Sequence, residues 1–356
     1  MSIGDPPVEA RADAPQARRL YFYGRGGTLF GIHIVNILLT VVTLGIYYFW
    51  GKVKVRAYLL GQTEFEGDRF AFHGTGKELL IGWLKAALVL GVPVFVLSTV
   101  PQLVDVGATL QGAALIVLYA FFLLFIPVAM VGARRYRLSR TSWRGIRFSF
   151  RGATRAFVKL FVKGALLTLV TMGLYYPVFE ARRYHFMVSH SYFGNRRFGF
   201  DGRGQDLLGV YLLAVLLFGF ALGVYALTFW LWIPIFDLNP AFYVFPFLLL
   251  AAIVAACWSW FSAKKQRYFW DHTAFDGARF HSTVTGGRLF RLKFANVLLL
   301  VFTLGLAWPW VAVRNARFAF RYLTLEGGLD LAGIQQEAQA ATAMGEGLAG
   351  FLDVGT

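Results

Sequence analysis

Apolar segments alternate with short polar units along the whole of this chain. The seven apolar segments cover residues 29–50, 79–100, 110–133, 156–179, 207–236, 242–263 and 289–313. Several of them reach the length of about 20 residues that a helix needs to cross a bilayer. The pattern predicts an all-α multi-pass membrane protein of tandem repeats, with four spans, three further spanning or re-entrant segments, and small β-hairpin-like units in the cytoplasm.

Two pairs of segments predict transmembrane hairpins. The connections 101–109 and 237–241 are short, and Asp105 and Asp237 are their only charged residues. The second segment therefore pairs with the third, and the fifth pairs with the sixth. Residues 134–155 carry eight arginines and no acidic residue. Because basic loops stay in the cytoplasm, we expect this end of the first hairpin to be cytoplasmic.

The first, fourth and seventh segments share a Thr-x-Gly motif, and basic residues flank each of them on both sides. Two interpretations are open. A re-entrant element that breaks at the glycine would keep both flanks in the cytoplasm, whereas three true spans would make successive repeats inverted, a plan common in secondary transporters. The motif residues are Thr43, Gly45, Thr171, Gly173, Thr303 and Gly305.

A polar unit with the pattern Thr-x3-Gly-x-Arg-Phe-x-Phe-x-Gly recurs between the apolar segments. In the copy at 63–74, Phe70 and Phe72 alternate with period two, which predicts a small β-hairpin. Four such hairpins on one side of the membrane could pair into a sheet or lie against the membrane through their phenylalanines, and we expect the aromatic side chains to be the anchors. Other full, variant and partial copies lie at 141–152, 191–202, 273–286, 22–26 and 324–327. The pattern glycines are Gly67, Gly74, Gly145, Gly152, Gly202 and Gly277.

These repeats divide the chain into five parts. They are a polar tail at 1–20, membrane repeats at 21–133 and 134–263, a partial repeat at 264–328, and a tail at 329–356. The first tail has no apolar core and is not expected to be a cleavable signal peptide. The last is rich in Ala, Gly and Glu, and we expect at most one short helix in it.

Composition agrees with a membrane location. The chain is 57% hydrophobic and 15% charged, with a mean hydropathy of +0.56 and a net charge of +16. The basic residues flank apolar spans, which favours anionic lipid over nucleic acid as the partner. Cys257 is the single cysteine, so an intramolecular disulfide is excluded.

The repeats also carry a resemblance to a known family. Over residues 21–328 the chain resembles the YjgN-like family of bacterial inner-membrane proteins, whose domain is of unknown function. The most specific stretch runs from Thr43 to the end of the first polar unit, and its motif returns at 303–310. The second repeat departs from it, because Gly164 stands where Asn36 and Asn296 precede the threonine. The resemblance implies a multi-pass inner-membrane protein and no particular activity.

Catalytic and metal-binding signatures are weak, and we expect neither an enzyme nor a cofactor. The stretch 74–77 hints at a phosphate loop but lacks its first glycine and its Ser or Thr. His185 and His190 are five residues apart, a poor helical spacing for one metal ion. Four polar residues lie in or near the ambiguous segments and are functional candidates by default: His33, Asn36, Glu180 and Asn296.

Basic residues at corresponding repeat positions are the candidate ligand-binding set. They are Lys54, Arg56, Arg134, Arg182, Arg314 and Arg317. They could line a cytoplasmic vestibule for an anionic solute or lipid headgroup, or they could serve helix ends and the lipid surface.

The leading functional hypothesis is a transporter or channel for a small anionic solute. The alternative is a non-transporting scaffold or anionic-lipid-binding protein, which would have no continuous polar path through its helices. A membrane enzyme is disfavoured because no nucleophile–base or metal constellation is evident. The expected partners are anionic membrane lipids, with a second copy or another membrane protein also possible.

Overall fold

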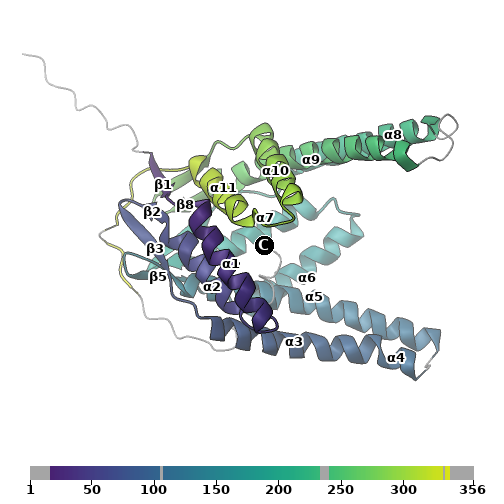
Figure 1. Ribbon diagram of the computed structural model, residues 1–356, viewed down its shortest axis with the longest axis horizontal. Coiled ribbons are helices and arrows are strands. Elements are labelled where there is room, and N and C mark those ends of the chain that lie inside the picture. The colour runs from purple at the N-terminus through teal and green to yellow at the C-terminus, as the bar shows by residue number, and fades with distance from the viewer. Residues whose placement is uncertain (1–16, 105–106, 233–239, 332, 337–356) are drawn as a thin grey trace, which may run out of the picture.

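The structure, a computed structural model, describes residues 17–104, 107–232, 240–331 and 333–336. Within these residues, ten short strands close into an antiparallel β-barrel, seen at one end of the molecule in Figure 1. The strands are β1 (Arg18–Phe22), β2 (Thr63–Phe65), β3 (Asp68–Phe72), β4 (Thr141–Trp143), β5 (Ile146–Phe150), β6 (Ser191–Phe193), β7 (Arg196–Phe200), β8 (Thr273–Phe275), β9 (Ala278–Ser282) and β10 (Leu323–Glu326).

The expectation of an all-α fold is wrong, because the hairpins pair with one another and close into a barrel, which goes beyond the sheet that the sequence left open. Phe72 of β3 is opposite Thr141 of β4, and β5 and β7 meet the next hairpins in the same way. β1 ends at Phe22, where the first partial copy begins, and β10 includes most of the last partial copy. β1 pairs with β10 and also with β2. An isolated hairpin leaves two open edges, whereas a closed barrel leaves none.

Tight turns at one end of the barrel explain the glycine in the middle of the polar unit. Between β2 and β3, Glu66 has a φ of 49° and Gly67 a φ of 82°. Two consecutive positive φ values define the type I′ turn, whose twist matches that of paired strands and which favours glycine. Arg144 and Gly145 repeat this conformation, as does the turn between β8 and β9.

Strand alternation places the phenylalanines inside the barrel. On β3, Phe70 packs in an interior cluster with Trp143 and Phe193, whereas Arg69 is exposed on the outside. The expected membrane anchoring by these aromatic residues is therefore wrong for the inward position of each strand. A closed barrel has an interior, and burial of an aromatic ring there removes 150–250 Å² of surface from water, on the general scale for such side chains.

In the units at 63–74, 141–152 and 191–202, the last glycine lies against the phenylalanine two residues earlier. A Cβ atom at Gly152 would lie 2.6 Å from the ring of Phe150, and one at Gly202 would lie 2.5 Å from the ring of Phe200. A larger residue would have to displace a buried ring. The Phe-x-Gly spacing is thus a packing requirement at the junction between strand and helix.

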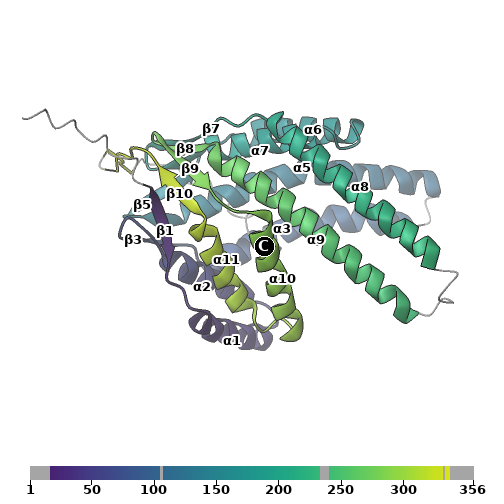
Figure 2. The same ribbon diagram turned by 90° about the horizontal axis from the view of Figure 1, so that it is seen from above.

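Every described connection at the other end of the barrel is a helical hairpin, so all the hairpins extend to the same side (Figures 1 and 2). Three are short: α1 (Gly26–Val42) with α2 (Tyr48–Gly61), α6 (Thr154–Val170) with α7 (Tyr176–Ser189), and α10 (Gly286–Phe302) with α11 (Trp308–Arg321). Two are long: α3 (Gly76–Ser98) and α4 (Val100–Leu103) with α5 (Ala108–Ser139), and α8 (Asp206–Trp232) with α9 (Pro240–Asp271).

The Thr-x-Gly motif reverses the chain in each short hairpin. Thr43 accepts a hydrogen bond from the N–H of Tyr47 at 2.9 Å and donates one to the carbonyl of Leu39 at 2.7 Å. Leu44 and Gly45 have φ values of 51° and 94°, a left-handed conformation that ends a helix. Both flanks therefore return to the barrel. Of the two interpretations left open by the sequence, the structure shows the one that breaks at the glycine.

The tips of the short hairpins are apolar and exposed. The residue before each motif glycine is almost fully accessible: Leu44 is 93%, Met172 96% and Leu304 93% exposed. An apolar surface of this kind rarely faces water in a soluble protein. The tips are suited to insertion part-way into a bilayer from the side on which the barrel lies.

Contacts between the two helices of a short hairpin explain why the second repeat has a glycine where the other two have an asparagine. Asn36 on α1 lies against Gly51 on α2 and donates a hydrogen bond to its carbonyl at 3.3 Å. In α6 and α7, Gly164 lies directly under the ring of Phe179. In the first repeat the glycine is on the second helix of the hairpin, and in the second repeat it is on the first helix. Either arrangement lets the two helices lie close together. Asn296 instead donates to Asn315 on α11.

The long hairpins carry the spans. In the described part of the chain, four helical segments are long and apolar enough to cross a membrane: Gly76–Leu103, Ala108–Ser139, Asp206–Leu231 and Pro246–Asp271. They coincide with the four spans that the sequence predicts. Most of their surface is exposed apolar side chain, as lipid contact requires.

Neighbouring hairpins interlock in a ring beneath the barrel. A glycine at the start of one hairpin packs against a tryptophan of the hairpin beside it, as Gly26 does with Trp310, Gly76 with Trp50 and Gly286 with Trp260. Because α11 also packs on α1, the ring closes between the two ends of the chain. A central space remains inside this ring.

Labelling of single cysteines tests the one-sided topology. In a Cys257→Ser background, Glu66→Cys and Arg144→Cys lie in separate exposed turns of the barrel, and Leu103→Cys lies at the far end of the first long hairpin. We expect an impermeant thiol reagent to label Leu103→Cys in intact cells, and the two turn variants only after the membrane is opened. Labelling of one turn but not the other from outside would contradict the structure.

Because Gly164 lies against the ring of Phe179, a larger side chain at position 164 should clash with that ring. Gly164→Ala should lower the free energy of unfolding by about 1–3 kcal/mol, the general cost of overpacking, and Phe179→Ala in the same chain should recover part of the loss. Gly31→Ala is the matched control, since a Cβ atom on this α1 glycine meets nothing within 4 Å. Thermal unfolding in detergent measures all four chains. Equal stability of Gly164→Ala and Gly31→Ala would refute the packing argument.

Candidate functional site: a basic chamber inside the helical ring

Two adjoining cavities occupy the space inside the ring. The first has a volume of about 720 Å³ and lies between α5, α7 and the near end of the barrel. The second, of about 790 Å³, lies between α1, α2 and the start of α11. Arg137 of α5 lines both. We call the two cavities together the basic chamber, because cationic side chains line it: Lys52, Arg56, Arg134, Arg137 and Arg183.

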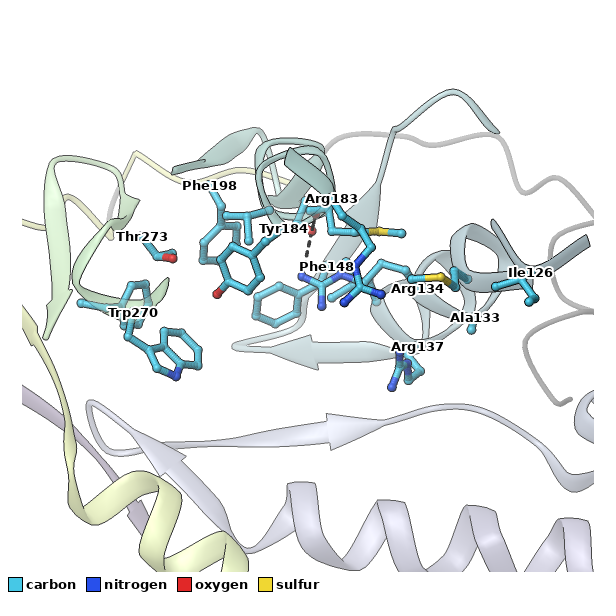
Figure 3. A pocket seen from close by; sticks show the side chains of 16 residues that line it. Ile126, Ala133, Arg134, Arg137, Phe148, Arg183, Tyr184, Phe198, Trp270 and Thr273 are labelled. Atoms are coloured by element: carbon cyan, nitrogen blue, oxygen red, sulfur yellow. Dashed lines mark hydrogen bonds between the residues drawn. The ribbon is translucent and has the colours of Figure 1, made fainter. Parts of the chain in front are cut away.

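Helical spacing brings these cations to one place. Lys52 and Arg56 are four residues apart on α2, and Arg134 and Arg137 are three apart on α5, so each pair shares a helix face. The ring then brings the two faces together. Figure 3 shows Arg134 and Arg137 reaching into the first cavity, with Trp270 across the space. Among the described residues that line the chamber, there is no aspartate or glutamate.

The cations are close enough to perturb one another. Burial lowers the pKa of Lys52 from 10.5 to about 8, and the charges of Arg56 and Arg137 contribute to the shift. Burial also lowers the pKa of Arg56, with Arg137 as the next cause. Like charges in a poorly solvated space each disfavour the charged form of the other. A bound anion would remove this penalty.

Arg134 is the most enclosed of these cations. It donates from Nη2 to the hydroxyl of Ser191 at 3.1 Å. Its Nε is buried, and no hydrogen-bond acceptor for it is found in the described part of the chain. A buried guanidinium N–H without an acceptor costs free energy, and a carboxylate or phosphate oxygen could accept from it in a planar geometry.

Arg183 is neutralised within the protein. Glu180, which is 7% exposed, forms an ion pair with Arg183 and lies 3.4 Å from Lys265 of α9. This carboxylate therefore joins α7 to α9. It faces two cations, so it serves as a structural ion pair in the ring.

Apolar side chains form the remaining walls. Ile126, Met130 and Met187 line the first cavity, and Ile37 and Val41 line the second. Val41 is 69% exposed at the tip of the first short hairpin, so this wall continues onto the apolar surface. The chamber is thus cationic toward the barrel and apolar toward the hairpin tips.

The structure separates the six basic residues that the sequence singled out. Arg56 and Arg134 line the chamber. Lys54 is exposed and donates to the hydroxyl of Tyr47 at 2.6 Å, and Arg182 lies 5.8 Å from the ring of Tyr175. These two belong to the outer surface of the short hairpins, next to the tyrosine of the Thr-x-Gly motif.

The third repeat places its two basic residues differently again. Arg314 is exposed on α11, and Arg317 donates to the carbonyl of Gly24 at 3.1 Å. The repeat position alone did not point to Lys52, Arg137 or Arg183. For Lys52 and Arg137 the available signal was helical spacing from Arg56 and Arg134, on the same face of each helix.

The remaining polar candidates make contacts within the protein, and His33 and Asn36 also line the second cavity. His33 stacks on Trp308 with ring centroids 5.2 Å apart, which links α1 to α11. His185 and His190 each contact a backbone carbonyl through Nδ1. Within the described residues, no group of three His, Cys, Asp or Glu side chains could hold a metal ion.

Comparison with known proteins gives a family. Residues 17–351 match the profile of a family described as "Bacterial protein of unknown function (DUF898)". The chain belongs to this DUF898 family. The match covers the barrel and all the helical hairpins, so the family is defined by the whole assembly and not by one repeat.

Relatives of this DUF898 chain are proteins of the inner membrane. The chain is 27% identical to the inner membrane protein YjgN of Salmonella typhimurium over 367 aligned positions, which cover 87% of this chain and 89% of the relative. It is 35% identical to the YjgN protein of Escherichia coli over 136 positions, or 38% of this chain and 32% of that protein. No solved structure matches. With its four apolar helices, the chain is a multi-pass protein of the bacterial inner membrane.

Titration of Lys52 tests the proximity of the chamber cations. In the purified, lipid-free protein, NMR of ¹³C-dimethylated lysine should show Lys52 with a pKa of about 8. Arg56→Met removes a positive neighbour, so the pKa should rise toward 10.5. Arg314→Met, on the exposed face of α11, should leave it unchanged. A pKa that is the same in wild type and Arg56→Met would mean that these cations do not interact.

Proposed function

We propose that this protein binds the headgroup of an anionic lipid from the cytoplasmic leaflet in the basic chamber. The observation that carries the proposal is the lining of the chamber, which holds Arg56, Arg134 and Arg137 and no carboxylate among the described lining residues. Phosphate and carboxylate groups are the ligands that arginine recognises best, through paired N–H donors.

The depth of the chamber suits a headgroup. Arg56 follows Tyr48, the first residue of α2, by eight residues, which places it about 12 Å along the helix from the apolar tip. The tips insert into the hydrocarbon region, so the arginines lie at the level of the polar interface. The apolar wall through Val41 and Ile126 would then contact the upper part of the acyl chains.

Transport by a single copy finds less support. The first long hairpin packs on α2 and α6, and the second packs on α7 and α10. Figure 1 shows the two hairpins diverging away from the barrel. A solute path across the membrane needs spanning helices that enclose it. The basic chamber thus favours a lipid-binding role, the alternative function that the sequence left open.

Lipid-dependent stability tests this proposal. In detergent, phosphatidylglycerol should raise the melting temperature of the wild-type chain more than phosphatidylcholine does. Arg56→Met with Arg137→Met should weaken phosphatidylglycerol binding by roughly tenfold or more, because hydrogen bonds to charged groups contribute about 1.5–3 kcal/mol each. The measurements are native mass spectrometry and thermal unfolding across a lipid titration.

Lys54→Met with Arg182→Met is the matched control. It removes the same amount of charge, but from the exposed outer face of the short hairpins. Its affinity for phosphatidylglycerol should remain within about twofold of wild type, as expected for surface charges that are screened by salt. Equal losses in the two double variants would show that the lipid responds to net charge alone, and the proposal would fail.

A further inference from the structure

The barrel has an apolar cavity of its own. Its volume is about 320 Å³, and each strand from β2 to β9 contributes one aromatic side chain to its described lining. Several of these inward rings, Phe70 and Phe148 among them, are only half-buried. Protein cores contain few voids larger than a water molecule, so an apolar space of this size is an unfilled site and not ordinary packing.

This cavity, which we call the lumen, joins the basic chamber. Phe148, Phe198, Trp270 and Phe280 line both the lumen and the first chamber cavity. Arg134 and Arg137 therefore lie next to its mouth. A ligand that extends from the chamber into the barrel would pass from a cationic environment to a mostly apolar one, whose described lining also includes Arg18, Gln266 and Thr324.

The opposite end of the lumen is covered by the C-terminal segment, of which residues 329–331 and 333–336 are described. Leu329, Leu331 and Ile334 pack against the aromatic cluster of the barrel. The backbone N–H of Gln335 donates to Asn195 in the β6–β7 turn at 3.2 Å, and Gln336 accepts from the N–H of Arg147 at 2.7 Å. The lumen thus ends at this segment.

We propose that the lumen binds the hydrocarbon chain of a long-chain fatty acid whose carboxylate lies in the basic chamber. A blind apolar cavity of about 320 Å³ suits one chain, and the cations at its mouth complement one carboxylate. The buried Nε of Arg134 supplies a donor for it. The inference rests on the proposed function for the anion site. It adds a hydrocarbon chain that lies inside the barrel and not in the membrane.

Photo-crosslinking with a palmitate analogue tests the inference on the full chain in detergent. A diazirine at the methyl end of the probe should mark residues of the lumen, among them Leu331 at its end, as mapped by mass spectrometry. Excess palmitate should compete. Marks confined to the exposed faces of α3, α5, α8 and α9 would overturn the inference, because they would show the chain only in the position of a bilayer lipid.

A variant that fills the end of the lumen farthest from the basic chamber gives a second test. Leu331→Trp should reduce labelling by the palmitate probe roughly tenfold, since exclusion of about two methylene groups suffices for that change. Ala71→Trp places the same ring on the exposed outer face of β3 and should label like wild type. Equal labelling of the two variants would count against an acyl chain in the lumen.

The two proposals fail in different ways. Leu331→Trp should leave stabilisation by phosphatidylglycerol unchanged, because the chamber is intact. Loss of lumen labelling in wild type, with phosphatidylglycerol binding retained, would overturn only the fatty-acid inference. Absence of phosphatidylglycerol binding, with competed labelling in the lumen, would overturn the lipid-headgroup function and leave the fatty-acid site supported.

Discussion

Strand pairing at the seam of the barrel is the constraint on which the rest of this structure depends. There, β1 near the start of the described chain pairs with β10 near its end, as Arg18 does with Leu325. Strands of three to five residues have little stability alone, and only closure pairs all their edges. Because every helical hairpin begins and ends at a strand of the barrel, closure also fixes the order of the hairpins around the ring.

The ring determines where charge accumulates. A single arginine at a membrane interface extends to the headgroups and needs no partner in the protein. Here α2 and α5 direct their cations toward a shared space, and the pKa of Lys52 falls to about 8 as a result of burial and of its cationic neighbours. The protein thus holds like charges together at a cost in stability. Glu180 forms an ion pair with Arg183, and the described lining that the α2 and α5 cations share contains no aspartate or glutamate.

Particular residues show how far prediction from the sequence extended. The period-two pattern of Phe70 and Phe72 predicted a strand and left pairing into a sheet open. Local spacing does not identify which strand lies on the other side, so the closed barrel and its interior were not predicted. The sequence showed that the second repeat has Gly164 in place of the asparagine of the other two repeats. Its reason, the facing ring of Phe179, depends on a contact across helices. Arg56 and Arg134 were found because they occupy corresponding positions in the repeats. Lys54 and Arg182 also correspond to each other in the repeats, but they lie outside the basic chamber.

The sequence by itself determined the membrane location, the four spans, the recurring strand–turn–strand units and the chain reversals available at the Thr-x-Gly motifs. Length, hydropathy and local backbone preference act within one segment and need no partner. Only the tertiary structure decided that the units close into one barrel, that all hairpins leave it on one side, and that arginines from α2 and α5 share a chamber. Those outcomes depend on contacts between residues distant in sequence, and the closed ring of strands is what selects them.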